Sequence, residues 1–438
     1  MKIPQSLLGL IYLFSTTLFA QDSVRLTLSQ ALDESLKNNN EVALANLDMQ
    51  IATTKFNQTH AIFLPQINLS YTAFTTDNPL NAFGFKLQQQ AITANDFNPE
   101  LLNNPASTQN YLTKAEWNQP ILNMDMLAQR KAANLQVDVY AYKAKRTKEY
   151  VAFEVEKAYT QLQVALHAVT VLNDAVQTVK AIHQSTLHYY EKGLIQKSDL
   201  LQVQVHLANT ETRLAEAKSN VKNASDYLSL MMGLKPGMIY QTETLEKTTA
   251  SLSANQQVPE NRSDFMALQS AIHAQKQLVN SGRYSYLPKL NAFANYFLND
   301  HSVFGFQAQS YLAGAQLSWN LFSGLSTRSK VAEYKTELTK AERQLRYQKE
   351  QAQLELHKTF RQLEDASFNI RQAEIAVEQS SEALRIIKDR YDHGLVSTND
   401  LLQAQTVFSQ QKLLHMQAIM QYLTTNAYLK FLTTTSGK

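Results

Sequence analysis

The chain of 438 residues contains no cysteine. This absence excludes disulfide bonds, thiol nucleophiles and thiolate metal ligands. It also removes the thiol to which the lipid chains of a lipoprotein attach, so we expect no lipid anchor. Glycine and proline are scarce as well, with 11 and 9 residues. Because these two residues mark turns, their scarcity predicts few turns and long secondary-structure elements.

Charged residues are also few, and the common catalytic motifs are absent. Only 18% of the residues are charged, and the net charge is +3. This weakly basic character excludes the electrostatic footprint of a nucleic-acid-binding protein. The mean hydropathy of −0.32 excludes a polytopic helical membrane protein. The motifs HExxH, GxSxG, GxGxxG and the P-loop are absent, and the histidines are scattered. We therefore expect no enzyme activity, no metal site and no cofactor.

The first twenty residues have the pattern of a secretory signal peptide. Lys2 precedes an apolar run from Leu7 to Phe19, and Ala20 is a small residue suited to cleavage. The alternative is an N-terminal membrane anchor, for which the apolar run is short. The sequence thus predicts an exported protein from which residues 1–20 are removed.

Two segments of the chain repeat one another. Residues 188–201 read HYYEKGLIQKSDLL and residues 389–402 read DRYDHGLVSTNDLL, at a constant offset of 201 residues. A repeat of this kind indicates a tandem duplication, which constrains the whole architecture. We expect one domain over residues 21–438. It consists of two structural repeats, at 27–232 and 262–433, joined by an equatorial linker at 233–261.

Four short segments alternate apolar and polar residues. In the first, Ile67, Leu69 and Tyr71 alternate with Asn68 and Ser70. This period of two predicts strands with one apolar face. Segments of roughly 9–11 residues can cross a bilayer when tilted, although a half-buried soluble sheet is the alternative. The predicted strands lie at 66–74, 111–121, 289–297 and 311–322, with loops expected at 75–110 and 298–309.

Long helices flank these strands. Residues 124–190 and 325–393 contain no glycine or proline, and each segment would span on the order of 100 Å as a helix. Their apolar residues follow the heptad spacing of a coiled coil, and the second helix repeats the register of the first. The heptad positions include Val155, Leu162, Leu356 and Leu363.

Each long helix is predicted to turn back at a glycine, either Gly193 or Gly394. Glycine at these positions is typical of a helix C-terminus. Return helices are expected from Ser198 to about residue 232 and from Ser397 to about residue 431, with Ser198 and Thr398 as candidate caps. Shorter helices are predicted at 26–60 and 262–286.

The order of the elements predicts a conduit. Each strand pair lies between helices, so the helices of both halves lie on one side of whatever the strands cross. Transmembrane barrels need about eight strands or more, and an open sheet edge is forbidden in lipid. Four membrane-spanning strands must therefore be completed by other copies of the chain. The signal peptide places the helices in the periplasm and the strands in the outer membrane.

The chain resembles the TolC-type outer-membrane efflux family from about residue 27 to residue 431. The motifs that carry this resemblance are AIFLPQINL, SYLPKLNAF, QPILN, WNLFSG and the tips YEKGLIQKSDLL and YDHGLVSTNDLL. The resemblance implies a mainly helical fold with a transmembrane β part. In a homotrimer, duplicated long-helix hairpins form a trimeric α-barrel joined to a shared 12-stranded β-barrel. It implies a periplasmic adaptor, also called a membrane fusion protein, and an inner-membrane transporter as partners.

The resemblance also implies that the tunnel closes at the tips. Tyr391 matches a tyrosine three residues before the second tip glycine. Asp199 matches the aspartate that pairs with this tyrosine, and Ser198 supplies the preceding hydroxyl. Val396 occupies the position where some members carry an arginine, which argues against an arginine-based lock.

Two further features of the family bear on the tips. Asp400 matches one of two aspartate rings at the constriction, but Gln403 occupies the position of the other, so we expect a single ring. The alternative role for Asp400 is that of a charge at the start of a helix. The family's adaptor contact involves the tip loops, which here contain Gly193, Leu194, Gly394 and Leu395.

The predicted function is that of a passive exit duct in a tripartite efflux pump or a type I secretion system. The competing hypothesis is a soluble periplasmic coiled-coil scaffold or adaptor. Adaptors carry one hairpin and a compact β-domain, whereas this chain carries two hairpins and two strand pairs. Drugs, metal ions, metabolites and polypeptides all leave through such ducts, because specificity resides mainly in the transporter.

Overall fold

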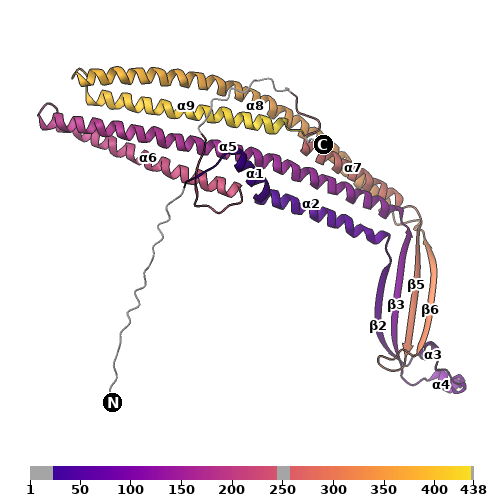
Figure 1. The fold of residues 1–438 in the computed structure, drawn as a ribbon. Helices are drawn as coiled ribbons and strands as arrows, with labels where there is room; N and C mark the ends of the chain where they lie inside the picture. The colour runs from indigo at the N-terminus through magenta and orange to yellow at the C-terminus, as the bar shows by residue number, and fades with distance from the viewer. Residues whose placement is uncertain (1–22, 244–256, 436–438) are drawn as a thin grey trace, which may run out of the picture. The chain divides into compact units, whose positions relative to one another are not determined.

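The computed structural model describes residues 23–243 and 257–435 (Figure 1). The predicted signal peptide lies outside these described residues. The described chain is mainly helical and contains one four-stranded sheet, which confirms the predicted fold class. It divides into two compact units. Among the described residues, unit 1 comprises 23–43, 147–243, 257–259 and 352–434, and unit 2 comprises 44–146, 260–351 and 435.

Unit 2 contains an antiparallel sheet with the strand order β2-β3-β5-β6 (Figure 1). Each strand is rich in aromatic or aliphatic residues at every second position, which suits a pleated sheet. The predicted last strand ran to residue 322, but β6 ends at Ser318. The indole of Trp319 lies beyond the strand and donates to the carbonyl of Tyr286 at 2.9 Å. The bounds are β2 Gln66–Thr76, β3 Thr108–Leu122, β5 Lys289–Asp300 and β6 Ala308–Ser318.

The apolar positions of the four strands lie in one register. Ile67 of β2 pairs with Trp117 of β3, which pairs with Ala294 of β5, which pairs with Ala313 of β6. Because paired residues of neighbouring strands project to the same side, these rows build one apolar face. The residues between them build a face with amide, hydroxyl and charged side chains, so the whole sheet is amphipathic.

The expected loop between β2 and β3 is a folded insert instead. Residues 77–107 contain α3 (Pro79–Gln88), a 3-10 turn (Ala94–Phe97) and α4 (Pro99–Asn103). The physical reason is the Asn-Pro pair that begins each helix. Proline at the first helical position has the required φ, and the side chain of Asn78 accepts a hydrogen bond from the backbone N–H of Asn81 at 3.2 Å.

The remaining helices follow the predicted order, with one break near the N-terminus. The segment predicted as a single helix at 26–60 divides at Asn39, whose side-chain amide donates to the carbonyl of Met231 at 2.8 Å. The bounds are α1 Leu28–Asn38, α2 Asn40–Gln58, a 3-10 turn Thr59–Ile62, α5 Met124–Glu191, α6 Lys197–Met231, α7 Ser263–Tyr284, α8 Ser326–Asp392 and α9 Thr398–Thr433.

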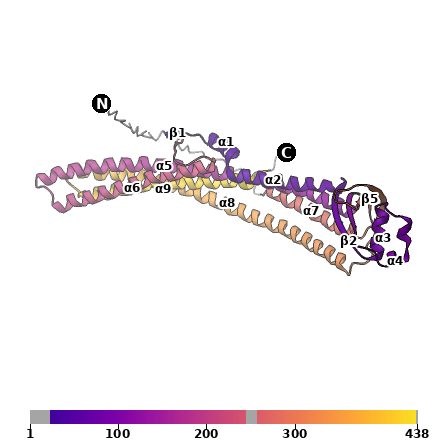
Figure 2. The same cartoon turned by 90° about the horizontal axis from the view of Figure 1, so that it is seen from below.

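In unit 1 the predicted heptad positions form the core. Val155, Leu162 and Leu356 are fully buried, and Leu363 is 2% exposed. A short parallel pair, β1 (Ser23–Arg25) and β4 (Ile239–Gln241), lies beside this core. Figure 2 shows the helices of the two hairpins extending together toward their tips.

Candidate functional site

The two hairpin tips of unit 1 have the same backbone geometry. Gly193 and Gly394 have φ values of +72° and +71°, a conformation that favours glycine. In each tip the N–H of the following leucine donates to the carbonyl five residues earlier, at 3.0 Å for Leu194 and 2.9 Å for Leu395. This is the Schellman arrangement of a helix C-terminus. The side chains of Leu194 and Leu395 are 67% and 70% exposed.

Tyr391 is buried beside these tips. Its side chain is 8% exposed and packs with Val203 of α6 and with Leu401 of α9. Its hydroxyl lies 3.3 Å from Oγ1 of Thr186 on α5. Because the Thr186 hydroxyl donates to the carbonyl of Ile182 at 2.8 Å, the tyrosine is the donor in this pair. Tyr391 therefore joins α8 to α5.

Asp199 and Ser198 interact within their own turn and not with Tyr391 in the part of the chain that the structure describes. The Asp199 carboxylate accepts from the backbone N–H of Gln196 at 3.2 Å, and the Ser198 hydroxyl lies 3.4 Å from the Gln196 amide oxygen. The expectation that Ser198 caps α6 is wrong. The helix begins at Lys197, so Ser198 lies inside its first turn and Gln196 holds the cap position.

Asp400 closes a capping box at the start of α9. Its carboxylate accepts from the hydroxyl of Ser397 at 2.6 Å and from the Ser397 backbone N–H at 3.0 Å. The Ser397 hydroxyl, and then the Ser397 N–H, hold the pKa of this carboxyl below its usual value. Ser397 is the cap, so the expectation for Thr398 is wrong, since Thr398 is already the first helical residue.

Val396 belongs to the apolar cluster of the tips. It packs against the same buried cluster as Tyr391. An apolar side chain in this environment gains by burial, whereas an arginine there would lose its hydration. The apolar surroundings thus give a physical reason for valine instead of arginine at this position.

A contact between α6 and α9 was missed in the sequence. Nε2 of His206 lies 2.9 Å from Oγ1 of Thr406. The Thr406 hydroxyl donates to the carbonyl of Leu402 at 2.8 Å, so the imidazole donates to threonine. Burial lowers the pKa of His206, and the Arg213 guanidinium lowers it further. The repeat gave no signal for this contact, because the offset of 201 residues aligns His206 with Val407 and Thr406 with Val205.

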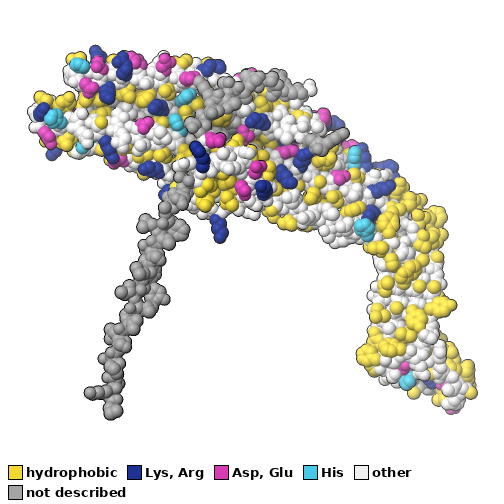
Figure 3. Space-filling model, in the orientation of Figure 1, with side chains coloured by type: hydrophobic (Ala, Val, Ile, Leu, Met, Phe, Trp, Pro, Cys, Tyr) yellow, Lys and Arg dark blue, Asp and Glu magenta, His cyan; other side chains and the backbone are white. Residues whose placement is uncertain are grey.

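The two faces of the sheet in unit 2 differ in chemistry. The apolar face leaves Ile67 75%, Leu69 70% and Leu317 68% exposed. Hydrophobic side chains gather over the strands in Figure 3. The polar face carries an ion pair between Lys114 and Glu116. Exposed apolar surface of this extent is unusual for a water-soluble monomer and marks a membrane or protein contact.

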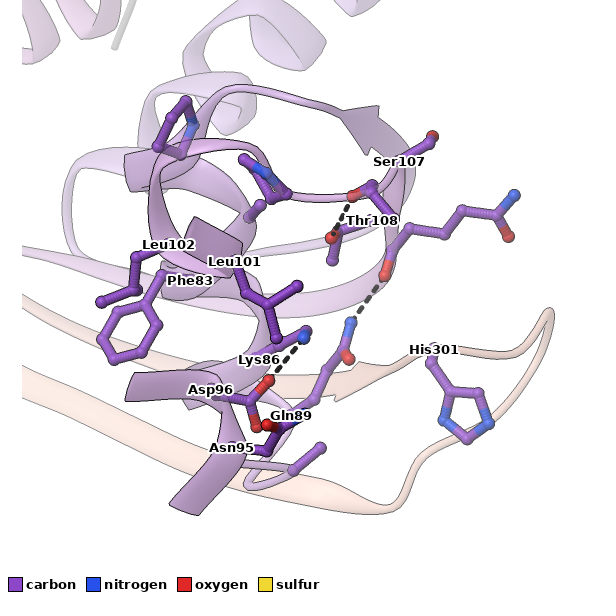
Figure 4. Close-up of a pocket in the computed structure, with 16 residues that line it drawn as sticks. Phe83, Lys86, Gln89, Asn95, Asp96, Leu101, Leu102, Ser107, Thr108 and His301 are labelled. Atoms are coloured by element: carbon purple, nitrogen blue, oxygen red, sulfur yellow. Dashed lines mark hydrogen bonds and ion pairs between the residues drawn. The ribbon is translucent and has the colours of Figure 1, made fainter. Parts of the chain in front are cut away.

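A cavity of about 500 Å³ lies in the folded insert at the start of β3 (Figure 4). Phe83, Leu101 and Leu102 form its apolar wall, and His301 lies at its edge. Lys86 donates to the Asp96 carboxylate at 2.6 Å. This bond, followed by the hydroxyl of Thr93, lowers the pKa of Asp96 to about 2. Within the cavity the positive charge of Lys86 is therefore neutralised by the carboxylate of Asp96.

The described residues contain neither a metal-binding cluster nor a membrane-spanning helix. Among residues 23–243 and 257–435, no cluster of three His, Asp or Glu side chains is arranged to hold a metal ion. Within the same ranges, no helix combines the length and the apolar character needed to cross a bilayer.

Comparisons with known proteins identify a family from the sequence and a shared fold from solved structures. The sequence model described as "Outer membrane efflux protein" matches residues 31–234 and 254–435. The solved structure of CusC is 14% identical with a TM-score of 0.78, covering 93% of this chain and 92% of that chain. The Campylobacter jejuni CmeC outer membrane channel is 16% identical with a TM-score of 0.77, covering 93% and 85%.

A third structure extends the likeness. The outer membrane protein VceC from Vibrio cholerae is 16% identical with a TM-score of 0.74, covering 93% of this chain and 95% of that chain. At these identities the structures show a shared fold. No curated protein matches the sequence.

Proposed function

The chain belongs to the outer membrane efflux protein family, and on that premise we propose that three copies form one continuous duct through the outer membrane. The protein is an efflux channel of that membrane, and the resemblance to the TolC-type family is confirmed. Each copy would contribute four strands to a shared 12-stranded barrel. The helical hairpins would form a tunnel in the periplasm.

The amphipathic sheet is the observation that carries this proposal. One face of all four strands is apolar in a common register, and its side chains are exposed. The edge strands β2 and β6 each have one neighbour in the described sheet. Lipid cannot satisfy the free N–H and C=O groups of such edges. Pairing β6 of one copy with β2 of the next would satisfy them and leave the apolar face toward lipid.

The tips are the proposed gate and partner surface. Tyr391, Asp199, Ser198 and Asp400 would form the constriction, with Asp400 of three copies as a single ring. The exposed Leu194 and Leu395, each beside a glycine with positive φ, suit contact with an adaptor. The adaptor would connect the duct to an inner-membrane transporter, which supplies the energy, so the duct needs no catalytic group.

A membrane-extraction experiment tests the assembly. The protein should remain with the outer membrane until detergent is added, and native mass spectrometry in detergent should then give a trimer. Insertion of the purified trimer into a planar bilayer should produce discrete conductance steps. Recovery of a folded monomer from the periplasm without detergent would contradict the duct and favour a soluble scaffold or adaptor.

A further inference from the structure

Helix α3 of the folded insert lies against the polar face of the sheet. The ring of Phe85 on α3 is 5.5 Å from the ring of Phe74 on β2. Phe74 alternates with the apolar row, and so it projects to the same side as Asn68 and Ser70. By contrast, the β5–β6 loop folds over the other face, where Phe304 stacks on Tyr71 at 5.2 Å.

A chain of buried amides fixes the insert to this polar face. Nε2 of Gln89, the residue that caps the C-terminus of α3, donates to the carbonyl of Gln109 at 2.7 Å and to the side-chain oxygen of Asn110 at 3.1 Å. The amide of Asn110 then donates to Oδ1 of Asn299 on β5 at 3.0 Å. Asn110 is fully buried and Asn299 is 3% exposed. Satisfied buried amides of this kind hold a single geometry, because any shift would leave a desolvated group unpaired.

The opposite side of α3 is free. Ala82, Phe85 and Gln89, at spacings of three and four, lie on the side that faces the sheet. Leu80, Gly84 and Leu87 fall on the other side of the helix, by the period of 3.6 residues. The side chains of Leu80 and Leu87 are 81% and 54% exposed. A Cβ added to Gly84 would meet no atom within 4 Å.

We propose that α3 of three copies faces the axis of the duct, where Leu80 and Leu87 form an apolar collar at the outer mouth. This inference rests on the proposed function, because the polar face becomes the lumen face only when three sheets close into one barrel. The collar is a constriction separate from the helical tips. It would be the last surface that exported molecules meet.

The dimensions allow such a collar to narrow the mouth. Twelve strands about 4.8 Å apart and tilted by about 40° enclose a circle roughly 24 Å wide. Three helices of about 11 Å diameter, packed side by side, occupy a circle of about the same width. An apolar constriction resists hydrated ions because it dewets, whereas apolar and amphipathic solutes cross it readily. The collar therefore selects for amphipathic or apolar small molecules over free ions.

Single cysteines test where α3 lies, since the chain has no cysteine of its own. Leu87→Cys places a thiol on the free side of α3, and Val303→Cys is the matched control. Val303 is 59% exposed and lies in the loop that folds over the opposite face of the sheet. In the full-length trimer, a short bis-maleimide should link pairs of Leu87→Cys copies into dimers on denaturing gels. Val303→Cys should stay monomeric, and a monofunctional maleimide should label both variants equally.

The outcomes of this experiment distinguish a failure of the collar from a failure of the proposed duct. A labelled, trimeric Leu87→Cys protein that yields no cross-linked species would overturn the collar while leaving the duct intact. A wild-type protein that forms no trimer in detergent would instead contradict the proposed function. As a second readout, Leu80→Ser with Leu87→Ser should raise the K⁺ conductance of trimers whose tips are open. Conductance equal to that of the parent protein would also overturn the collar.

Discussion

The hydroxyl of Tyr391 donates to Oγ1 of Thr186, 3.3 Å away, and this bond crosses from one helical hairpin to the other. Both groups are buried, at 8% and 0% exposure. Thr186 occupies the repeat position of Ile387, so the duplication has an apolar residue in one copy and a hydroxyl in the other. The hydroxyl that accepts this bond is therefore present in the first hairpin and not at the equivalent position of the second.

Removing the hydroxyl of Tyr391 should favour the open duct. Tyr391→Phe keeps the ring in its apolar cluster and deletes the bond, which is worth about 1 kcal/mol. The open-to-closed ratio should rise about fivefold for each copy, provided that the bond is lost on opening. Single-channel recording in planar bilayers measures this ratio.

The matched variant is Thr186→Val, which leaves the tyrosine hydroxyl buried without its acceptor. Its effect should be at least as large as that of Tyr391→Phe, because an unpaired buried group costs about 1–3 kcal/mol. The open-to-closed ratio of the double variant should then be close to that of each single variant. The departure from additivity measures the coupling energy of the pair. Strict additivity of the two changes would show that the two groups act independently.

Acidification should loosen the contact between α6 and α9. The folded-state pKa of His206 is lowered, so in the folded protein the neutral imidazole is favoured. The unfolded or separated state binds the extra proton more readily, and the contact loses stability as the pH falls below about 6.5. Conductance should therefore rise as the pH falls below about 6.5. His206→Gln keeps a side-chain donor for Thr406 and should remove this component of the pH response.

Asp400 should govern block by multivalent cations. Its pKa is lowered, so its carboxylate stays ionised down to about pH 4 and the capping box persists above that pH. Asp400→Asn retains an oxygen acceptor for Ser397 but removes the charge, and block by trivalent cations should weaken. Glu382→Gln, which removes an exposed carboxylate of α8 outside the proposed constriction, is the control. Equal block in the wild type and in Asp400→Asn would contradict a ring at this position.

Periodic burial made most of the fold predictable from the sequence. The heptad residues Val155 and Leu162 are buried in the structure, as their spacing required. The tip glycines were predictable as well, because a positive φ strongly favours glycine. The partner of Tyr391 was not, since a heptad gives the face of a helix but not which residue of another hairpin meets it.

The folded insert shows a signal that was present and missed. The segments DNPLNAF and FNPELLN each place asparagine and proline at a helix start, although their high content of turn residues favoured a loop. The buried chain from Gln89 to Asn299 was beyond reach, because it joins residues that only strand register brings together. Buried amides of this kind depend on tertiary contacts that local patterns do not encode.

The exposed tip leucines give the final prediction. Leu395→Glu combined with Gly394→Lys places charge and a Cβ at a turn with φ of +71°, where glycine is favoured. The side chains at both positions point into open space, because Leu395 is 70% exposed and a Cβ at Gly394 meets no atom within 4 Å. The trimer should therefore persist, with the backbone cost confined to one turn. Export in cells should be lost, because a charged tip cannot match an apolar adaptor surface.

The control is Leu395→Met, which preserves the apolar contact and should export normally. Normal export by the charged double variant would refute the tips as the adaptor surface, and a lost trimer would show that Gly394 is needed for assembly instead.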